Sequence, residues 1–177
     1  MSRLFDIYVK SYRLDPVKDR DYFKTVDDLY LTPQVQSLSQ YEQHLDINRL
    51  QHITSVSYMS YRIAVFFHLD SRMIARATLL HDLFYYDWRD AEGFWHRPHG
   101  YKHPVFALLN ACELDKTLDK KQKDMIRHHM FPLTLPPVYP EGYILVFSDK
   151  YCACRELLYS LSKSYKNKFN RLTGVSK

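Results

Sequence analysis

The segment Ile74-Ala-Arg-Ala-Thr-Leu-Leu-His-Asp-Leu83 closes a mostly apolar stretch with two ionisable residues in succession, His81 and Asp82. Such side chains are costly inside a protein core unless they are hydrogen-bonded, paired or bound to a cation. Imidazole and carboxylate are both good ligands for divalent first-row metal ions, and a bound cation compensates the buried charge. The segment therefore predicts a metal site, for which the nine histidines of the chain offer further ligands.

Apolar spacing on either side of the pair predicts helices. Between residues 49 and 67, positions of one helix face recur at intervals of four, three, four and three: His52, Val56, Met59, Ile63 and Phe66. This spacing places His52 on the buried face of a long helix. A second helix is expected over residues 72–84. Each helical residue turns the chain by about 100°, so Asp82 would lie that far around the helix from His81.

The rest of the chain also has a helical pattern. Val and Ile rarely alternate with polar residues, and neither a repeat nor a convincing strand is found. We therefore predict an all-α fold. Further helices are expected over residues 20–30, 34–45 after Pro33, a stretch opened by His103-Pro104, 119–130 and 141–163.

Length and composition predict one globular domain. The chain has 177 residues, and we place the core at about 40–160 and a basic helical tail at 161–177. The formal charge of +5 suits a phosphate-bearing ligand but is too small to indicate nucleic acid. The basic run over residues 163–171 is expected to be a solvated helix, with a patch for nucleotide or RNA as the alternative.

Cysteine usage and hydropathy favour a cytoplasmic protein. Three cysteines, Cys112, Cys152 and Cys154, without a secretory leader suggest reduced thiols. The spacing of Cys152 and Cys154 makes their side chains diverge on a helix, which argues against a zinc knuckle. The longest apolar runs are far shorter than the roughly 20 residues that a membrane span needs, so no membrane association is expected.

Other potential ligands lie in similar settings. His103 stands before a proline, His128 and His129 end a charged segment, and Asp149 interrupts the apolar stretch Ile144-Leu-Val-Phe-Ser-Asp-Lys150. Each has an ordinary alternative, such as a histidine bonded to a carbonyl or an Asp149 paired with Lys150 or Arg155. Taken together, four histidines and two aspartates offer six ligands, which suits two octahedral ions sharing a carboxylate.

The order His52, His81-Asp82, Asp149 resembles the HD-domain metal-dependent phosphohydrolases over residues 40–160. The wording Leu79-Leu-His-Asp-Leu83 is similar to the family's LLHD segment, and Ile144–Lys150 resembles its closing apolar-aspartate helix. His103-Pro104 and Met125-Ile-Arg-His-His-Met130 resemble the two extra histidine motifs of the dinuclear branch.

The resemblance implies a pair of divalent ions, drawn from Fe, Mn, Co, Ni, Zn or Mg. His52, His81, Asp82 and Asp149 would hold one ion. Asp82 would bridge to a second ion, which would be held by His103 and by one member of the 128/129 pair. We favour His129 over His128, because it lies three residues after Ile126 in the family's register.

The resemblance also implies hydrolysis of a phosphate monoester or diester. The substrate would be a nucleotide or another small phosphorylated metabolite, attacked by a metal-bound hydroxide. His99 and Lys102 join Asp82 as candidate catalytic groups. Candidate substrate-binding residues are His44, Arg89, Arg97 and Lys150. Aromatic residues between 86 and 102 would stack on a base or anchor their loop to the core; they are Tyr86, Trp88, Phe94 and Trp95.

Two other functions fit the same residues. Similar six-ligand sites with two irons support oxygenase chemistry on diols and polyols. A metal-stabilised sensor or interaction module without catalysis is the second alternative. The substrate, the nature of the ester, the metal and the oligomeric state are left open by the sequence.

Overall fold

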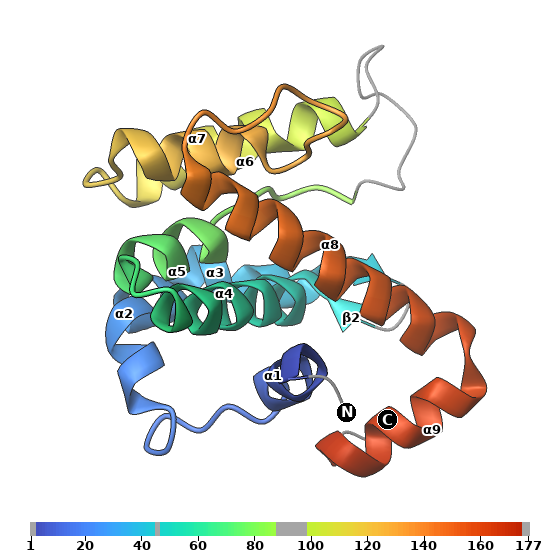
Figure 1. Ribbon diagram of the computed structural model, residues 1–177. Coiled ribbons are helices and arrows are strands. Elements are labelled where there is room, and N and C mark those ends of the chain that lie inside the picture. The colour runs from blue at the N-terminus through green and yellow to red at the C-terminus, as the bar shows by residue number, and fades with distance from the viewer. Residues whose placement is uncertain (1–2, 45–46, 88–98, 175–177) are drawn as a thin grey trace.

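The computed structural model describes residues 3–44, 47–87 and 99–174, and in these residues the fold is all-α (Figure 1). Within these ranges, nine α-helices and one 3-10 helix account for nearly all of the regular structure, and a short antiparallel pair of strands accounts for the remainder. The elements are α1 (Arg3–Ser11), α2 (Arg20–Tyr30), α3 (Pro33–Gln36), η1 (Ser37–Gln40), β1 (Glu42–His44), β2 (Ile47–Asn48), α4 (Arg49–Phe66), α5 (Ser71–Leu79), α6 (His99–Leu114), α7 (Lys120–His128), α8 (Pro140–Leu161) and α9 (Lys163–Thr173).

Helix α4 is the central helix, and it is buried on almost all sides. Asn48 caps its first turn by accepting a hydrogen bond from the Gln51 amide. Small side chains let neighbours approach closely, as where the Ser57 hydroxyl donates to the Ala75 carbonyl of α5. The predicted inward stripe is therefore right for His52, Val56 and Met59 but wrong for Phe66, which is 57% exposed at the end of the helix. The stripe is also too narrow, because serines of the other faces are buried.

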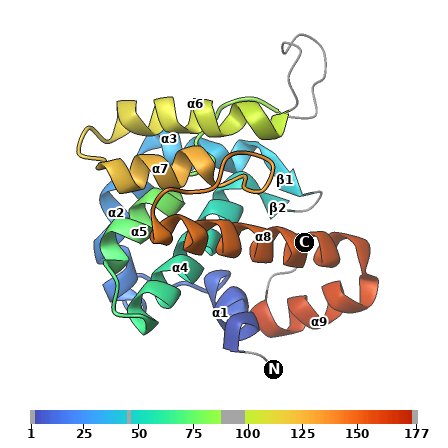
Figure 2. The same ribbon diagram turned by 45° about the horizontal axis from the view of Figure 1, so that its top comes forward.

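The helices form layers around α4 (Figures 1 and 2). In both views α6 and α7 lie together above α4 and α5, and we call this pair the α6–α7 layer. Helix α8 crosses the molecule and packs against α4 and α7. The residues predicted as ligands therefore come from segments far apart in sequence: α4, the turn after α5, α6, the segment after α7, and α8.

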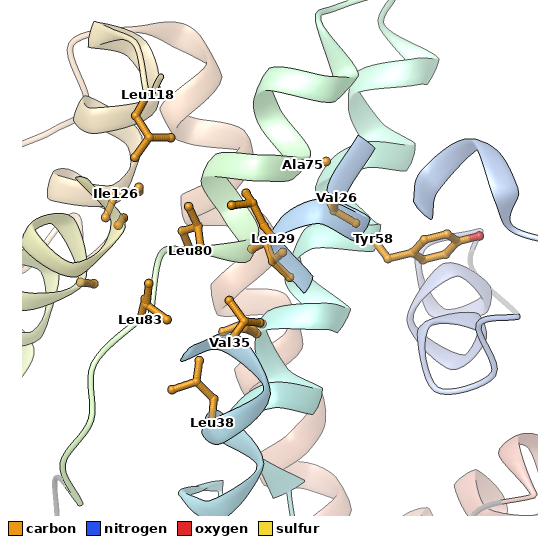
Figure 3. Close-up of a cluster of buried hydrophobic side chains, with 14 of the residues drawn as sticks. Val26, Leu29, Val35, Leu38, Tyr58, Ala75, Leu80, Leu83, Leu118 and Ile126 are labelled. Carbon is orange, nitrogen blue, oxygen red and sulfur yellow. The ribbon is translucent and has the colours of Figure 1, made fainter. Parts of the chain in front are cut away.

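One cluster of buried side chains joins the α6–α7 layer to the rest (Figure 3). Ile126 of α7 and Leu118 just before it belong to the same cluster as Leu80 and Leu83, which follow α5. On the other side the cluster continues into α2, α3, η1 and α4, with Leu38 fully buried. Apolar packing therefore sets the distance between the α6–α7 layer and the turn that contains His81 and Asp82.

A second cluster holds α1 and α9 against α4 and α8. Phe169 of α9 is buried and meets the rings of Tyr8 and Tyr12 edge-on or tilted, with centroids 5.7 and 4.8 Å away. Ser162 caps α9, and Gly174 ends it in the left-handed region at a φ of 71°. The expectation of a basic helix over residues 163–171 is therefore confirmed, and Lys163, Lys168 and Arg171 are exposed. The helix is not solvated on all sides, because it is amphipathic and buries Phe169 and Thr173.

Two other expectations need correction. The helix predicted over 34–45 ends in η1 at Gln40, and β1 and β2 follow as a hairpin in which Glu42 pairs with Asn48. The helix predicted over 72–84 ends at Leu79, so the histidine–aspartate pair lies in a turn. The predicted helices over 20–30, 49–67 and 141–163 are confirmed within a few residues.

The cysteines and the helix hydropathy agree with the sequence predictions. Cys112, Cys152 and Cys154 are free thiols, and Cys152 is buried while Cys154 is exposed, as expected for side chains that diverge on a helix. Within the described ranges, none of the helices combines the length and the apolar character that a membrane crossing requires.

Candidate metal centre

The turn after α5 brings the side chains of His81 and Asp82 to the same place. Helix α5 ends at Leu79, and the Phe84 amide donates to the Asp82 carbonyl at 2.9 Å to tighten the turn. His81 Nε2 consequently lies 3.7 Å from Asp82 Oδ2, although the two residues would point about 100° apart on a continuous helix. Both are buried, with His81 at 0% exposure.

A first set of ligand atoms, group A, faces one side of Asp82. It consists of His52 Nε2, His81 Nε2 and Asp149 Oδ1, from α4, the turn and α8, and these atoms lie within 4.8 Å of one another. His52 Nε2 is 3.2 Å from Asp149 Oδ1, and His81 Nε2 is 3.9 Å from it. Asp82 turns its Oδ2 toward this group, 4.0 Å from His52 Nε2.

A second set, group B, faces the other oxygen of Asp82. It consists of His103 Nε2 from α6 and His129 Nε2, which follows α7, with Asp82 Oδ1 at 3.3 and 3.6 Å respectively. The two ring nitrogens are 2.8 Å apart. Asp82 therefore lies between the two groups with one oxygen directed to each.

In every ring, the nitrogen that points away from the centre, Nδ1, already has a hydrogen-bond partner; we call it the outer nitrogen. Nδ1 of three rings donates to a backbone carbonyl three or four residues earlier: His81 to Thr78 at 2.7 Å, His103 to His99 at 3.1 Å and His129 to Ile126 at 2.8 Å. A carbonyl can only accept, so the proton of each neutral ring is on Nδ1 and the lone pair of Nε2 points to the centre. Ligand histidines in metalloproteins are held in this way.

These residues fit a metal ion. Among the described residues, His81 Nε2 and Asp82 Oδ1 are buried without a hydrogen-bond partner, which is costly unless something else satisfies them. Burial lowers the pKa of His129 to about 3 and also lowers the pKa of His103. Both rings are therefore neutral near pH 7, and their lone pairs face each other at 2.8 Å. A cation bound by both rings would turn this repulsion into attraction.

The carboxylates of the centre are ionised. Burial would raise the pKa of Asp82, but the surrounding histidine rings outweigh it and hold the pKa below the usual range. The pKa of Asp149 is likewise lowered against the effect of burial, by the hydrogen bond to His52 and the charge of Lys150. The centre thus presents two carboxylates and four imidazoles, the donor set typical of divalent first-row metals.

A buried arginine orients Asp82 through Gln43. Arg49 is fully buried, with its guanidinium 3.6 Å from the centroid of the Phe84 ring, and its Nη1 donates to the Phe84 carbonyl at 2.7 Å. Its Nε donates to Gln43 Oε1 at 3.1 Å, and Gln43 Nε2 donates to Asp82 Oδ2 at 2.9 Å. The hairpin β1–β2 therefore fixes the rotation of the carboxylate that lies between the two groups.

A cavity of about 310 Å³ opens onto the centre. Lys150 lies at its edge, where Nζ donates to Asp149 Oδ2 at 2.8 Å and 42% of the side chain is exposed. His99 stacks on the ring of His103 with centroids 4.5 Å apart. Burial and the His103 ring lower the pKa of His99 to about 4. The lining consists of Gln43, Asp82, His99, His103, His129, Met130, Asp149, Lys150 and Ala153.

The structure brings together all six predicted ligands: His52, His81, Asp82, His103, His129 and Asp149. It places His129 in the centre, whereas His128 Nδ1 lies 2.8 Å from Asp124 Oδ1 outside it. His103 lies in the second turn of α6, whose first described residue is His99, and not at the helix start.

Only some of the other predicted site residues lie at the cavity. His99 and Lys150 line the cavity, whereas Lys102 lies on α6 and is not among the described lining residues. The backbone of His44 ends β1, but its side chain is outside the described part. Arg89, Arg97, Trp88, Phe94 and Trp95 also lie outside the described residues.

Sequence reasoning missed three residues around the centre: Gln43, Arg49 and Glu156. Glu156 places its two carboxylate oxygens 2.9 and 3.0 Å from Nδ1 of His52. A signal for Glu156 was present, because it follows Asp149 by seven residues and so lies on the same face of α8. The roles of Gln43 and Arg49 depend on the hairpin, which the sequence did not predict.

No protein-family model matches the chain, and no curated protein sequence or solved structure matches it either. The assignment of a candidate metal centre therefore depends on the geometry of the chain's own residues. Buried histidine and aspartate side chains from five segments converge on one point, and they form groups that can hold a metal ion.

Proposed function

We propose that the protein is a metal-dependent phosphohydrolase of the HD-domain type that acts on a phosphate ester of a nucleotide or another small metabolite. One observation carries the proposal: Asp82 lies between groups A and B with one oxygen directed to each, and the cavity that reaches them has the ammonium of Lys150 at its edge. The order of the ligands along the chain, which resembles the HD-domain pattern, adds to it.

Two divalent ions would be held. Group A with Asp82 Oδ2 would bind one ion, and group B with Asp82 Oδ1 would bind the other. Such ions would lower the pKa of water toward neutrality and neutralise the negative charge on a phosphoryl group.

The remaining polar residues of the cavity would position the substrate. The Lys150 ammonium can pair with a phosphoryl oxygen, because it lies beside the centre and 42% of its side chain is exposed. His99 is uncharged near neutral pH and can accept or donate one hydrogen bond without repelling the metal ions. Gln43 keeps Asp82 rotated so that one oxygen faces each group.

The test is release of phosphate by defined metal forms. The protein is stripped with a chelator, reloaded separately with Mn²⁺, Fe²⁺, Co²⁺, Ni²⁺, Zn²⁺ or Mg²⁺, and incubated with nucleotides, dinucleotides and sugar phosphates. We expect turnover of at least one ester in the wild type and none in Asp82→Asn. A matched control, His128→Ala, removes a neighbouring histidine that the centre does not use and should retain turnover.

Two results would contradict the proposal. Oxygen consumption by the iron form on a diol or polyol, without phosphate release, would indicate an oxygenase. Two bound ions with no turnover across the whole panel would indicate a metal-stabilised binding module.

A further inference from the structure

The outer-nitrogen partners of the four ligand histidines are not equivalent. His81, His103 and His129 each donate to a neutral backbone carbonyl. His52 instead has the side chain of Glu156, whose two oxygens lie 2.9 and 3.0 Å from Nδ1. Because both oxygens lie at nearly the same distance, both can accept the Nδ1–H of His52.

Glu156 is at an unusual place for a glutamate. Its residue is 0% exposed, and it lies among apolar and aromatic groups that include Tyr8 and Cys152 of the second core cluster. Burial of a carboxylate is strongly unfavourable unless a cationic or hydrogen-bonding partner compensates it. Helix α8 therefore contributes Asp149 to group A. Two turns later, the same helix places the Glu156 carboxylate against the outer nitrogen of His52.

This charge makes groups A and B electrostatically different. Group A combines Asp149, one oxygen of Asp82 and a histidine backed by Glu156. Group B has two histidines backed by carbonyls and only the other oxygen of Asp82. A carboxylate behind a ligand histidine increases the basicity of the ring and its affinity for a cation. More negative charge is therefore concentrated around group A.

We propose that Glu156 is a positioning residue that makes group A the tighter of two metal positions, so that group A fills first and group B second. This inference rests on the metal centre of the proposed function but not on the reaction that the centre performs. It predicts stepwise loading of the chain, with one ion retained at concentrations that empty group B.

The experiment measures metal affinity and not turnover. The stripped full-length protein is titrated with Mn²⁺ by calorimetry, and bound metal is counted after equilibrium dialysis. We expect two binding events of different affinity in the wild type. His129→Ala should remove the weaker event and preserve the tighter one.

Glu156→Gln then isolates the charge, since an amide oxygen can still accept from Nδ1–H. We expect the tighter event to weaken about 10–100-fold, the range typical of outer partners of ligand histidines, while the weaker event is unchanged. Glu156→Asp keeps the carboxylate on a side chain that is one methylene shorter, and so further from His52 Nδ1. This variant should retain part of the affinity that Glu156→Gln loses. Glu141→Gln provides the matched control, because it removes a carboxylate from the first turn of the same helix, where it pairs with Lys121.

Three outcomes would overturn the inference. Glu156→Gln could leave both events unchanged, or it could weaken the weaker event while the tighter one persists. The wild type could also bind two ions with equal affinity. Failure of the proposed function is distinct: it appears as absence of phosphate release from protein that has bound its metal, and it leaves the order of loading intact.

Discussion

Replacement of Asp82 by asparagine should remove metal from both groups without damaging the fold. Gln43 Nε2 donates to Asp82 Oδ2 at 2.9 Å, so the amide oxygen of the substituted side chain is expected on that side. The amide nitrogen then points to His103 Nε2 and His129 Nε2, which lie 3.3 and 3.6 Å from Asp82 Oδ1. An N–H group there satisfies the lone pairs that a cation would otherwise bind.

The size of the effect follows from binding linkage. At a metal concentration 100 times the dissociation constant, binding stabilises the wild type by about 2.7 kcal/mol. Loss of even an outer partner lowers metal affinity up to about 100-fold, and loss of a shared ligand should do at least as much. At the same metal concentration the variant would then gain only about 0.4 kcal/mol. For each ion, the difference of about 2.3 kcal/mol corresponds to a loss of about 5–9 °C in the metal-induced increase of Tm.

The assay is thermal unfolding of metal-free and metal-loaded protein, combined with counting of bound metal. Without metal, Asp82→Asn should unfold within about 4 °C of the wild type, equivalent to a change of at most about 1 kcal/mol. Asp124→Asn is the matched control, since Asp124 also contacts a histidine but lies outside the centre. Two ions retained by Asp82→Asn, or an unchanged metal-induced shift, would show that Asp82 is not shared between the two groups.

Three other variants test separate parts of the structure. His129→Ala should lose one bound ion per chain while His128→Ala keeps both, as counted by elemental analysis; equal loss would contradict the placement of His129. Lys150→Ala should lower kcat/KM for phosphate esters by about 10–100-fold, the effect of one charge-assisted hydrogen bond, with metal content unchanged. Asp115→Asn should destabilise the fold by about 1–3 kcal/mol in denaturant titrations, because Arg76 Nη2 donates to Asp115 Oδ2 at 2.8 Å. Burial would raise the pKa of Asp115, but its hydrogen bonds to Thr117 and Arg76 outweigh it and lower the pKa. The stabilisation by this carboxylate is therefore full at neutral pH and lost as pH falls through the folded-state pKa, and the variant should lack this part of the pH dependence.

The sequence predicted the ligands better than the backbone that holds them. His52 was placed correctly because a long helix repeats its apolar residues with a period that one sequence reveals. The turn that contains His81 and Asp82 was missed, because Leu80, Leu83 and Phe84 continue the apolar pattern of α5 without a glycine or proline to mark the helix end. Burial of those three residues under the α6–α7 layer is a tertiary effect that periodicity does not separate from helix.

The hairpin was missed for a related reason. Only a few residues form β1 and β2, and they alternate too briefly to distinguish a strand from the end of a helix. Its role depends on Arg49, whose charge would place it on a surface by composition alone. In the structure this guanidinium is held by the Phe84 carbonyl and Gln43, partners from two segments that come together only in the folded chain.

The orientation of the histidine rings is determined locally, whereas the approach of group B to Asp82 is determined by tertiary packing. Each of the rings of His81, His103 and His129 is held by a carbonyl three or four residues earlier, so its orientation is set within one turn of its own segment. The approach of group B to Asp82 is set instead by apolar packing of the α6–α7 layer, in which Ile126 is fully buried. Cations bound at groups A and B would therefore meet rings that are already oriented and two layers that the core already holds together. This reduces the ordering that metal binding itself must supply.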